Sequence, residues 1–148
     1  LEDEYGYKEQ GAISENKVKD IQRLQVLGWA QNVDFTENRT EVLWSKFLAD
    51  ERYVSDNLGI FEGACTFIKG VYRSTEESMM RSNIQGFNAP SRKSIYDRVM
   101  KVGMGKEATY EEFVIYDLQH RTQTRSVSTL IPDKPFAHPY FVGRALSE

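Results

Sequence analysis

Imidazole and thiol side chains carry much of the metal and nucleophilic chemistry of proteins, and this sequence contains few of them. It has one cysteine, Cys65, and two histidines, His120 and His138. A single cysteine excludes an intrachain disulfide and a thiolate zinc cluster, so we expect Cys65 to be a small buried apolar residue. His120 lies at the end of an expected helix, where it suits the free carbonyl groups, and His138 is expected at the surface or in packing. The two histidines alone therefore do not predict a self-contained zinc site.

Two short segments offer more specific chemistry. In LEDEY, Asp3 and Glu4 are adjacent carboxylates, although such a pair taken alone is typical of a solvated surface. In ESMMRSN, Met79 and Met80 follow an expected extended segment. These methionines are either flexible core fillers or a methionine turn, which metzincin zinc peptidases place beneath the metal, downstream of their H-E-x-x-H helix.

Together these segments resemble the bacterial IgA-peptidase-like zinc metallopeptidases. LEDEY looks like the end of that family's segment H-E-F-G-H-x-F-x-x-L-x-D-E-Y. The stretch IFEGACTFIKGVYRSTEESMMRSN is similar to its E-G-(small)-x-(aromatic), K-G-(aliphatic)-Y-R and S-M-M-R-x-N blocks, and FNAPSRKSIYDRVMK resembles the helix that follows. The likeness covers residues 1–101 and implies zinc-dependent hydrolysis of a protein or peptide substrate.

The resemblance implies a metal-binding role for the acidic opening. Asp3 is the candidate third zinc ligand, since a carboxylate oxygen can complete a tetrahedral site. Glu4 or Tyr5 is then a group that orients the ligands by hydrogen bonding. Met80 is the methionine-turn residue, which packs under the metal without binding it.

Three further residues are candidates for contacts with the substrate. Tyr72 is a candidate hydrogen-bond donor to the oxyanion. Arg73 and Arg81 either bind substrate carboxylates or form structural salt bridges.

The H-E-x-x-H segment itself is absent from the sequence. If the family spacing holds, both histidine ligands and the glutamate base lie upstream of Leu1. We therefore expect the C-terminal portion of a secreted or cell-surface zinc metallopeptidase, with zinc as the cofactor of the complete protein and no activity in this portion alone. The alternative is a non-catalytic binding or structural module derived from the same fold. A missing upstream helix would also expose apolar surface, so we expect self-association or association with the missing portion.

The expected fold is α+β, mainly helical with short strands or hairpins, and resembles the lower subdomain of a metzincin-like zinc peptidase. Residues 1–119 would form the C-terminal part of the catalytic domain. Residues 120–148, with Pro132, Pro135 and Pro139, would form an extended tail that packs on it. Helices are expected within residues 14–29, 36–53, 88–103 and 109–121, and two extended segments within residues 60–73. For residues 14–29, the family resemblance instead allows a long loop.

Capping residues and apolar spacing support these helices. The expected capping pairs are Asn38 with Glu41 and Thr109 with Glu112. Pro90 fits a first helical turn, and the expected helix ends are Gly28 and Gly103. The apolar faces expected on these helices are Val18, Ile21 and Leu24; Leu43, Trp44, Phe47 and Leu48; and Ile95, Val99 and Val102.

The bulk composition fits one domain and limits the class of partner. The 148 residues carry 19 basic and 22 acidic side chains, a net charge of -3, spread along the chain. This distribution argues against a general nucleic-acid binder, which carries a concentrated basic patch. No apolar run approaches the length of a membrane span, so none is expected.

Overall fold

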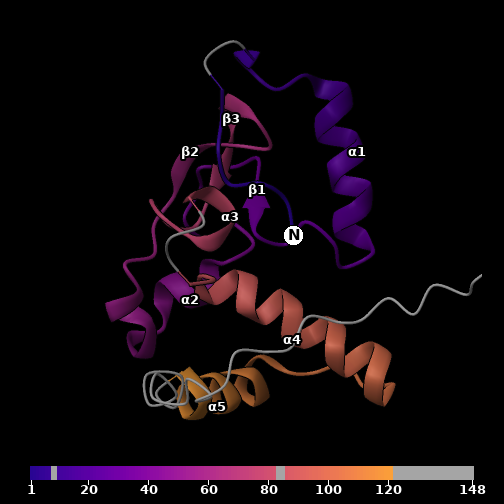
Figure 1. Cartoon of the computed structure of the whole chain (residues 1–148), viewed down its shortest axis with the longest axis vertical. Coiled ribbons are helices and arrows are strands. Elements are labelled where there is room, and N and C mark those ends of the chain that lie inside the picture. The colour runs from indigo at the N-terminus through magenta and orange to yellow at the C-terminus, as the bar shows by residue number, and fades with distance from the viewer. Residues whose placement is uncertain (8–9, 83–85, 122–148) are drawn as a thin grey trace, which may run out of the picture.

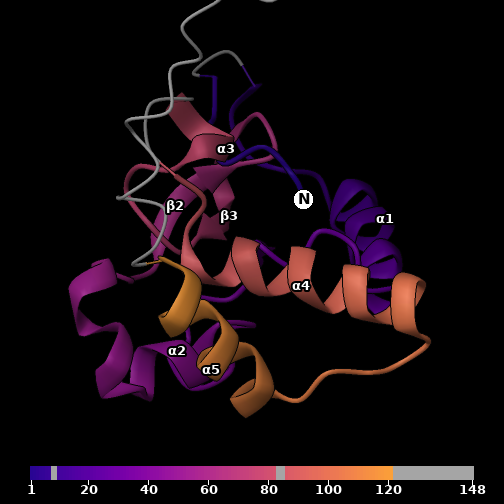
Figure 2. The same cartoon turned by 60° about the horizontal axis from the view of Figure 1, so that its bottom comes forward.

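The computed structural model describes residues 1–7, 10–82 and 86–121, which form a small sheet flanked by helices. The sheet is antiparallel with strand order β1-β3-β2, and its strands are Val33–Asp34, Phe67–Arg73 and Phe61–Ala64. The helical elements are α1 (Glu15–Val26), α2 (Ser45–Ala49), η2 (Glu51–Asp56), α3 (Met79–Ser82), α4 (Ala89–Met104) and α5 (Tyr110–Arg121). Figure 1 shows α1 beside the sheet and α4 with α5 beyond one end of it, and Figure 2 shows α5 lying obliquely to α4 and approaching its first half. The expected α+β class, with helix predominating, is confirmed.

Two hydrophobic clusters form the core, and β3 contributes to both. Successive residues of a strand point to opposite faces, so Val71 is buried in one cluster while Tyr72 packs against the other. The cluster near α1 contains Ile21, Ala30, Val33, Ala64, Cys65 and Val71. The cluster between α2, η2, α4 and α5 contains Val42, Trp44, Phe47, Tyr53, Ala89, Phe113 and Val114.

A tight hairpin joins β2 to β3. Its two turn residues, Cys65 and Thr66, have φ angles of 52° and 72°, and positive φ at both positions matches a type I′ turn. Gly63, with φ of 102°, lies in the register shift between Glu62 and Ala64. A β-branched residue in this left-handed region is strained, so Thr66 keeps this conformation only because the surrounding contacts hold it.

Local capping signals place three of the helices. Ser14 caps α1 by accepting the Lys17 amide at 3.3 Å, and Asn88 caps α4 by accepting the Ser91 amide at 3.0 Å. The reciprocal box at α5 is confirmed, because the Thr109 amide donates to Glu112 at 2.8 Å and the Glu112 amide donates back at 3.2 Å. The expected stop after α4 was two residues early, since α4 continues to Met104 and ends at Gly105, with φ of 63°.

The helix predicted within residues 36–53 was wrong in extent. The structure has turns before Ser45, then the short α2 and the 3₁₀ helix η2. Asn38 does not form a cap with Glu41. Its side-chain oxygen instead accepts the Thr40 amide at 3.1 Å, a local turn that competes with a helix. The Asp34 side chain accepts the Leu43 amide at 2.7 Å, a contact that a helix at this position would not make. The Leu43 side chain is exposed and does not join the buried Trp44 and Phe47.

The apolar side expected on α4 is largely exposed. Ile95, Val99 and Val102 are 40%, 61% and 68% exposed. The buried residues of α4 lie in its first turn instead, at Ala89, Pro90 and Ser91. Ala89 packs in the cluster with Trp44 and Phe113, and Ser91 contacts Glu4. On α1 only Ile21 is buried, and Leu24 is exposed.

No helix among the described residues is long and apolar enough to cross a membrane. Residues 120 and 121, predicted as the start of the extended tail, are the last residues of α5. The remaining residues of the predicted tail, 122–148, lie outside the described part of the chain.

Candidate functional site

The N-terminal segment runs along the tip of the β2–β3 hairpin. The carbonyl oxygen of Asp3 accepts the Cys65 amide at 2.7 Å, and that of Tyr5 accepts the Thr66 amide at 2.9 Å. The Tyr7 amide donates to the Thr66 carbonyl at 2.8 Å. These backbone hydrogen bonds fix the direction in which each side chain of the segment points.

Gly6 makes this close approach possible. A Cβ atom built on Gly6 would lie 2.3 Å from the carbonyl oxygen of Phe67, which no side chain tolerates. The glycine is therefore required by contact with the hairpin backbone, and not by turn geometry.

The acidic opening and the methionine segment meet in space. The Glu4 amide donates a hydrogen bond to the carbonyl oxygen of Met80 at 3.0 Å. Met80 lies in the single helical turn α3, and Ser78 immediately before that turn is buried. The two segments singled out by the sequence thus form one site, although β1, β2 and β3 separate them along the chain.

The Glu4 carboxylate is fully buried within a cage of neutral donors. It accepts five hydrogen bonds. Their donors are Asn32 Nδ2 at 2.9 Å, Ser78 Oγ at 2.5 Å, Asn88 Nδ2 at 3.1 and 3.0 Å to its two oxygens, and Ser91 Oγ at 3.4 Å. A buried carboxylate without such partners would be strongly destabilising, so the cage is what permits its burial.

The start of α4 adds a favourable electrostatic environment for Glu4. Asn88 is the N-cap of α4, and Ser91 lies in its first turn, so the carboxylate sits at the positive end of the helix dipole. The Asn88 side chain also donates to Thr75 Oγ1 at 3.0 Å, which connects the cage to the segment after β3. Glu4 therefore joins the N-terminal segment, α3 and α4.

Asp3 and Tyr5 point away from this cage, because neighbouring residues of an extended segment alternate in direction. Both are half-buried, in contrast to Glu4. Hydrogen bonding with Tyr7, and then with Asp3, raises the pKa of Tyr5 to about 12. Asp3 thus presents its carboxylate beside Tyr5 on the more accessible side of the segment.

Arg73 lies on the Glu4 side of the sheet, and its guanidinium is held by the hairpin. Its Nη1 donates to the carbonyl oxygens of Glu62 and Gly63, at 2.7 and 2.6 Å. Burial, together with the nearby Arg81, lowers the pKa of Arg73, and Glu4 opposes this effect. Its Nε is buried and has no hydrogen-bond partner among the residues that the structure describes.

The other two candidate residues, Tyr72 and Arg81, are not among the described donors to the Glu4 carboxylate. Tyr72 points to the opposite face of β3 from Arg73, and burial, followed by the charges of Glu37 and Glu62, raises its pKa. Arg81 donates to the Glu76 carbonyl and to the Glu77 carboxylate, within its own turn. The structure therefore brings Asp3, Glu4, Tyr5 and Met80 together with Arg73 nearby, and does not bring Tyr72 to them.

The described residues do not form a complete metal centre. No group of three or more His, Cys, Asp or Glu side chains in residues 1–7, 10–82 and 86–121 is arranged to hold an ion. Asp3 can provide one carboxylate ligand, so zinc would need further ligands. Cys65 is buried as expected, and burial raises the pKa of its thiol to about 12, which disfavours a reactive thiolate.

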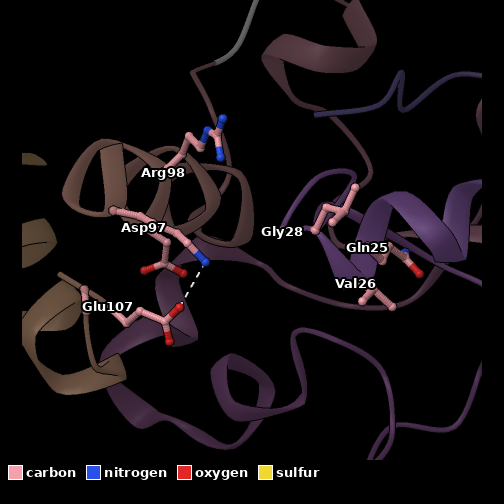
Figure 3. Close-up of a pocket in the computed structure, with 9 residues that line it drawn as sticks. Gln25, Val26, Gly28, Asp97, Arg98 and Glu107 are labelled. Carbon is pink, nitrogen blue, oxygen red and sulfur yellow. Dashed lines mark hydrogen bonds and ion pairs between the residues drawn. The ribbon is translucent and has the colours of Figure 1, made fainter. Parts of the chain in front are cut away.

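A separate polar pocket lies between the end of α1 and the second half of α4 (Figure 3). It has a volume of about 250 Å³ and is lined by Gln25, Val26, Leu27, Gly28, Asp97, Arg98, Lys101, Glu107 and Ala108. Lys101 pairs with Glu107 at 3.0 Å, and both side chains are largely exposed. Asp97 has a buried Oδ1 atom without a hydrogen-bond partner among the described residues, and the Arg98 guanidinium lies 4.7 Å from the centroid of the Trp29 ring.

Sequence reasoning found Glu4 and Met80 but missed the cage. Asn32, Ser78 and the pair Asn88 and Ser91 come from three separate places in the chain, and only Asn88, before Ala-Pro, carries a local signal as a helix cap.

Comparison with known proteins adds no identification. Neither a protein-family model nor a curated protein matches the sequence. The resemblance to IgA-peptidase-like zinc peptidases therefore stays a prediction based on the quoted motifs.

Proposed function

We propose that the chain is the C-terminal portion of a secreted zinc-dependent metallopeptidase, to which it contributes Asp3 as one metal ligand. The observation that carries this proposal is the 3.0 Å hydrogen bond between the Glu4 amide and the Met80 carbonyl oxygen. It joins the acidic segment to the methionine turn, which is the juxtaposition that a metzincin-like site requires.

The residues of this chain would position the ligand without performing the proton transfer. Glu4 anchors the segment through its buried cage, so that the neighbouring Asp3 carboxylate has a fixed direction. Pre-organisation of this kind is how partners of a ligand support metal affinity. Bound zinc would polarise the scissile carbonyl and lower the pKa of a water molecule, as in other zinc hydrolases.

The test compares the 148-residue chain with a longer chain that adds the upstream residues of its gene. We expect the longer chain to carry H-E-x-x-H, to bind one zinc ion and to hydrolyse a peptide substrate. In it, Asp3→Asn should lower zinc affinity by about tenfold or more. Asp20→Asn is the matched control, because Asp20 is an exposed residue of α1. Equal peptidase activity in the 148-residue chain, or no effect of Asp3→Asn, would overturn the proposal.

The second candidate function is a non-catalytic binding module, and the exposed apolar side chains of α1, α4 and α5 favour it. Val26, Leu27, Val99, Val102, Met104, Ile115 and Tyr116 are all exposed. Exposed apolar side chains mark an interaction site where they gather into one patch. An upstream sequence that lacks either histidine would support this module, and sedimentation at several concentrations would test the predicted self-association.

A further inference from the structure

An apolar groove separates α4 from α5, on the side where Ile95 and Val99 are exposed. Its volume is about 360 Å³, and its apolar lining is Ile95, Tyr96, Val99, Phe113 and Tyr116, with His120 at one end. The groove is distinct from the Glu4 site, because none of its lining residues belongs to the cage.

Aromatic rings follow one another along this groove, from the buried Phe113 at its base to the exposed Tyr116. The ring centroids of Phe113 and Tyr96 are 5.6 Å apart, and those of Tyr96 and Tyr116 are 4.9 Å apart. Tyr116 stacks on His120 with a separation of 4.1 Å. A row of aromatic rings between two helices is the kind of surface on which proline-rich segments dock.

Ion pairs hold the two walls of the groove in place at the end nearest Arg121. Arg92 on α4 donates to Asp117 on α5 through Nε at 2.6 Å and Nη2 at 2.8 Å. Arg121 donates to Asp56 at 2.6 Å, and Asp56 also accepts from Arg92 at 3.1 Å. The groove is thus preformed, so an occupant would pay little to order it.

We propose that this groove binds a segment of the same chain, residues 130–142, through its prolines and aromatic side chains. The segment reads LIPDKPFAHPYFV, in which Pro132 and Pro135 are three residues apart. A polyproline II helix has three residues per turn, so these two prolines share one face. Proline pre-sets the backbone for this conformation, which lowers the entropic cost of docking.

The tether favours this segment over a separate molecule. The described part of the chain ends at Arg121, which lines the groove, and residues 122–131 connect it to Pro132. A linker of this length has an r.m.s. span of roughly 18 Å, enough to lead back along the groove. It gives an effective concentration on the order of 1 mM. An intrinsic dissociation constant on the order of 0.1 mM would then leave the segment docked about nine-tenths of the time.

The experiment measures chymotryptic cleavage after Phe136 and Tyr140 in the full 148-residue chain under native conditions. Docking should slow cleavage about tenfold, the reciprocal of the undocked fraction. Val99→Lys places a charge in the groove at a side chain that is already 61% exposed, so the fold should persist. We expect both this variant and the double variant Pro132→Ala/Pro135→Ala to be cleaved about tenfold faster than the wild type.

Val26→Lys is the matched control, because Val26 is an exposed helical valine outside this groove. It should be cleaved at the wild-type rate. Equal cleavage rates in the wild type and Val99→Lys would overturn the proposal. Protection that grows with protein concentration would also overturn it, because the occupant would then be the tail of a second copy. This inference is independent of peptide hydrolysis, and loss of tail protection would leave the proposed zinc site untouched.

Discussion

The side-chain amide of Asn88 donates hydrogen bonds to both carboxylate oxygens of Glu4, at 3.1 and 3.0 Å. The other side-chain group of Asn88, its Oδ1 atom, accepts the Ser91 amide and caps α4. One residue therefore starts a helix and holds the N-terminal segment, so the two parts of the fold depend on each other. This dependence can be measured.

Removing the Glu4 carboxylate should destabilise the protein strongly. Glu4→Ala leaves the Ser78 hydroxyl and one N–H of each of the Asn32 and Asn88 amides buried without an acceptor. Each such group costs about 1–3 kcal/mol, so the free energy of unfolding should fall by at least about 3 kcal/mol. Glu4→Gln keeps the shape and one acceptor oxygen, and should cost about 1–3 kcal/mol. Urea unfolding gives both values.

The control for Glu4 is Glu76→Ala, which changes an exposed carboxylate near the same turn. Surface changes of this kind are usually within about 0.5 kcal/mol of the wild type. If Glu4→Ala were as stable as Glu76→Ala, the cage would contribute nothing, and the anchoring of Asp3 would fail with it.

Two glycine-to-alanine substitutions should change the stability of the fold in opposite directions. Gly6→Ala forces a Cβ against the Phe67 carbonyl, so it should lower stability by about 1–3 kcal/mol. Gly103→Ala has open space around its Cβ and lies inside α4, so it should raise stability by about 0.5–1 kcal/mol. Thermal unfolding midpoints of the two variants, compared with that of the wild type, measure both changes. A neutral Gly6→Ala would mean that the N-terminal segment can leave the hairpin freely.

The hairpin turn offers a gain in stability at Thr66. Its φ of 72° is strained for a β-branched residue, and glycine adopts this region without a steric penalty. Thr66→Gly should therefore raise the free energy of unfolding by about 1 kcal/mol. Thr66→Ala keeps the Cβ penalty and serves as the comparison. A Thr66→Gly variant no more stable than Thr66→Ala would show that side-chain contacts of Thr66 outweigh the strain.

Acid should weaken the contact between η2 and α5. Hydrogen bonds from Arg52, and also from Tyr110, lower the pKa of Asp50 from 3.8 to about 2. A depressed carboxylate pKa stabilises the fold above the unfolded value, and this contribution is lost as pH falls from about 4 to about 2. Wild-type stability should therefore drop over this interval more steeply than that of Asp50→Asn. Urea midpoints between pH 2 and 6 test this, and parallel curves would contradict it.

The sequence by itself determined the features that depend on residues close together in the chain. The pair Thr109 and Glu112 caps α5 through contacts three residues apart, so its spacing was sufficient to predict it. Ser14 and Asn88 cap α1 and α4 over the same short range, although they were not among the expected caps. Asn38 shows the limit of such signals. The same side chain can cap a helix or close a turn, and the distant Asp34 contact with the Leu43 amide favours the turn.

Only the tertiary structure decided which polar groups became buried and which apolar side chains did not. Glu4 looked like a solvated acid, but Asn32, Ser78, Asn88 and Ser91 converge on it from separate segments, and no local pattern encodes that convergence. Val99 has the spacing of a core residue, yet the packing of α5 beside α4 leaves it at the edge of an open groove. Periodicity shows that a helix has an apolar face, whereas burial depends on what packs against that face.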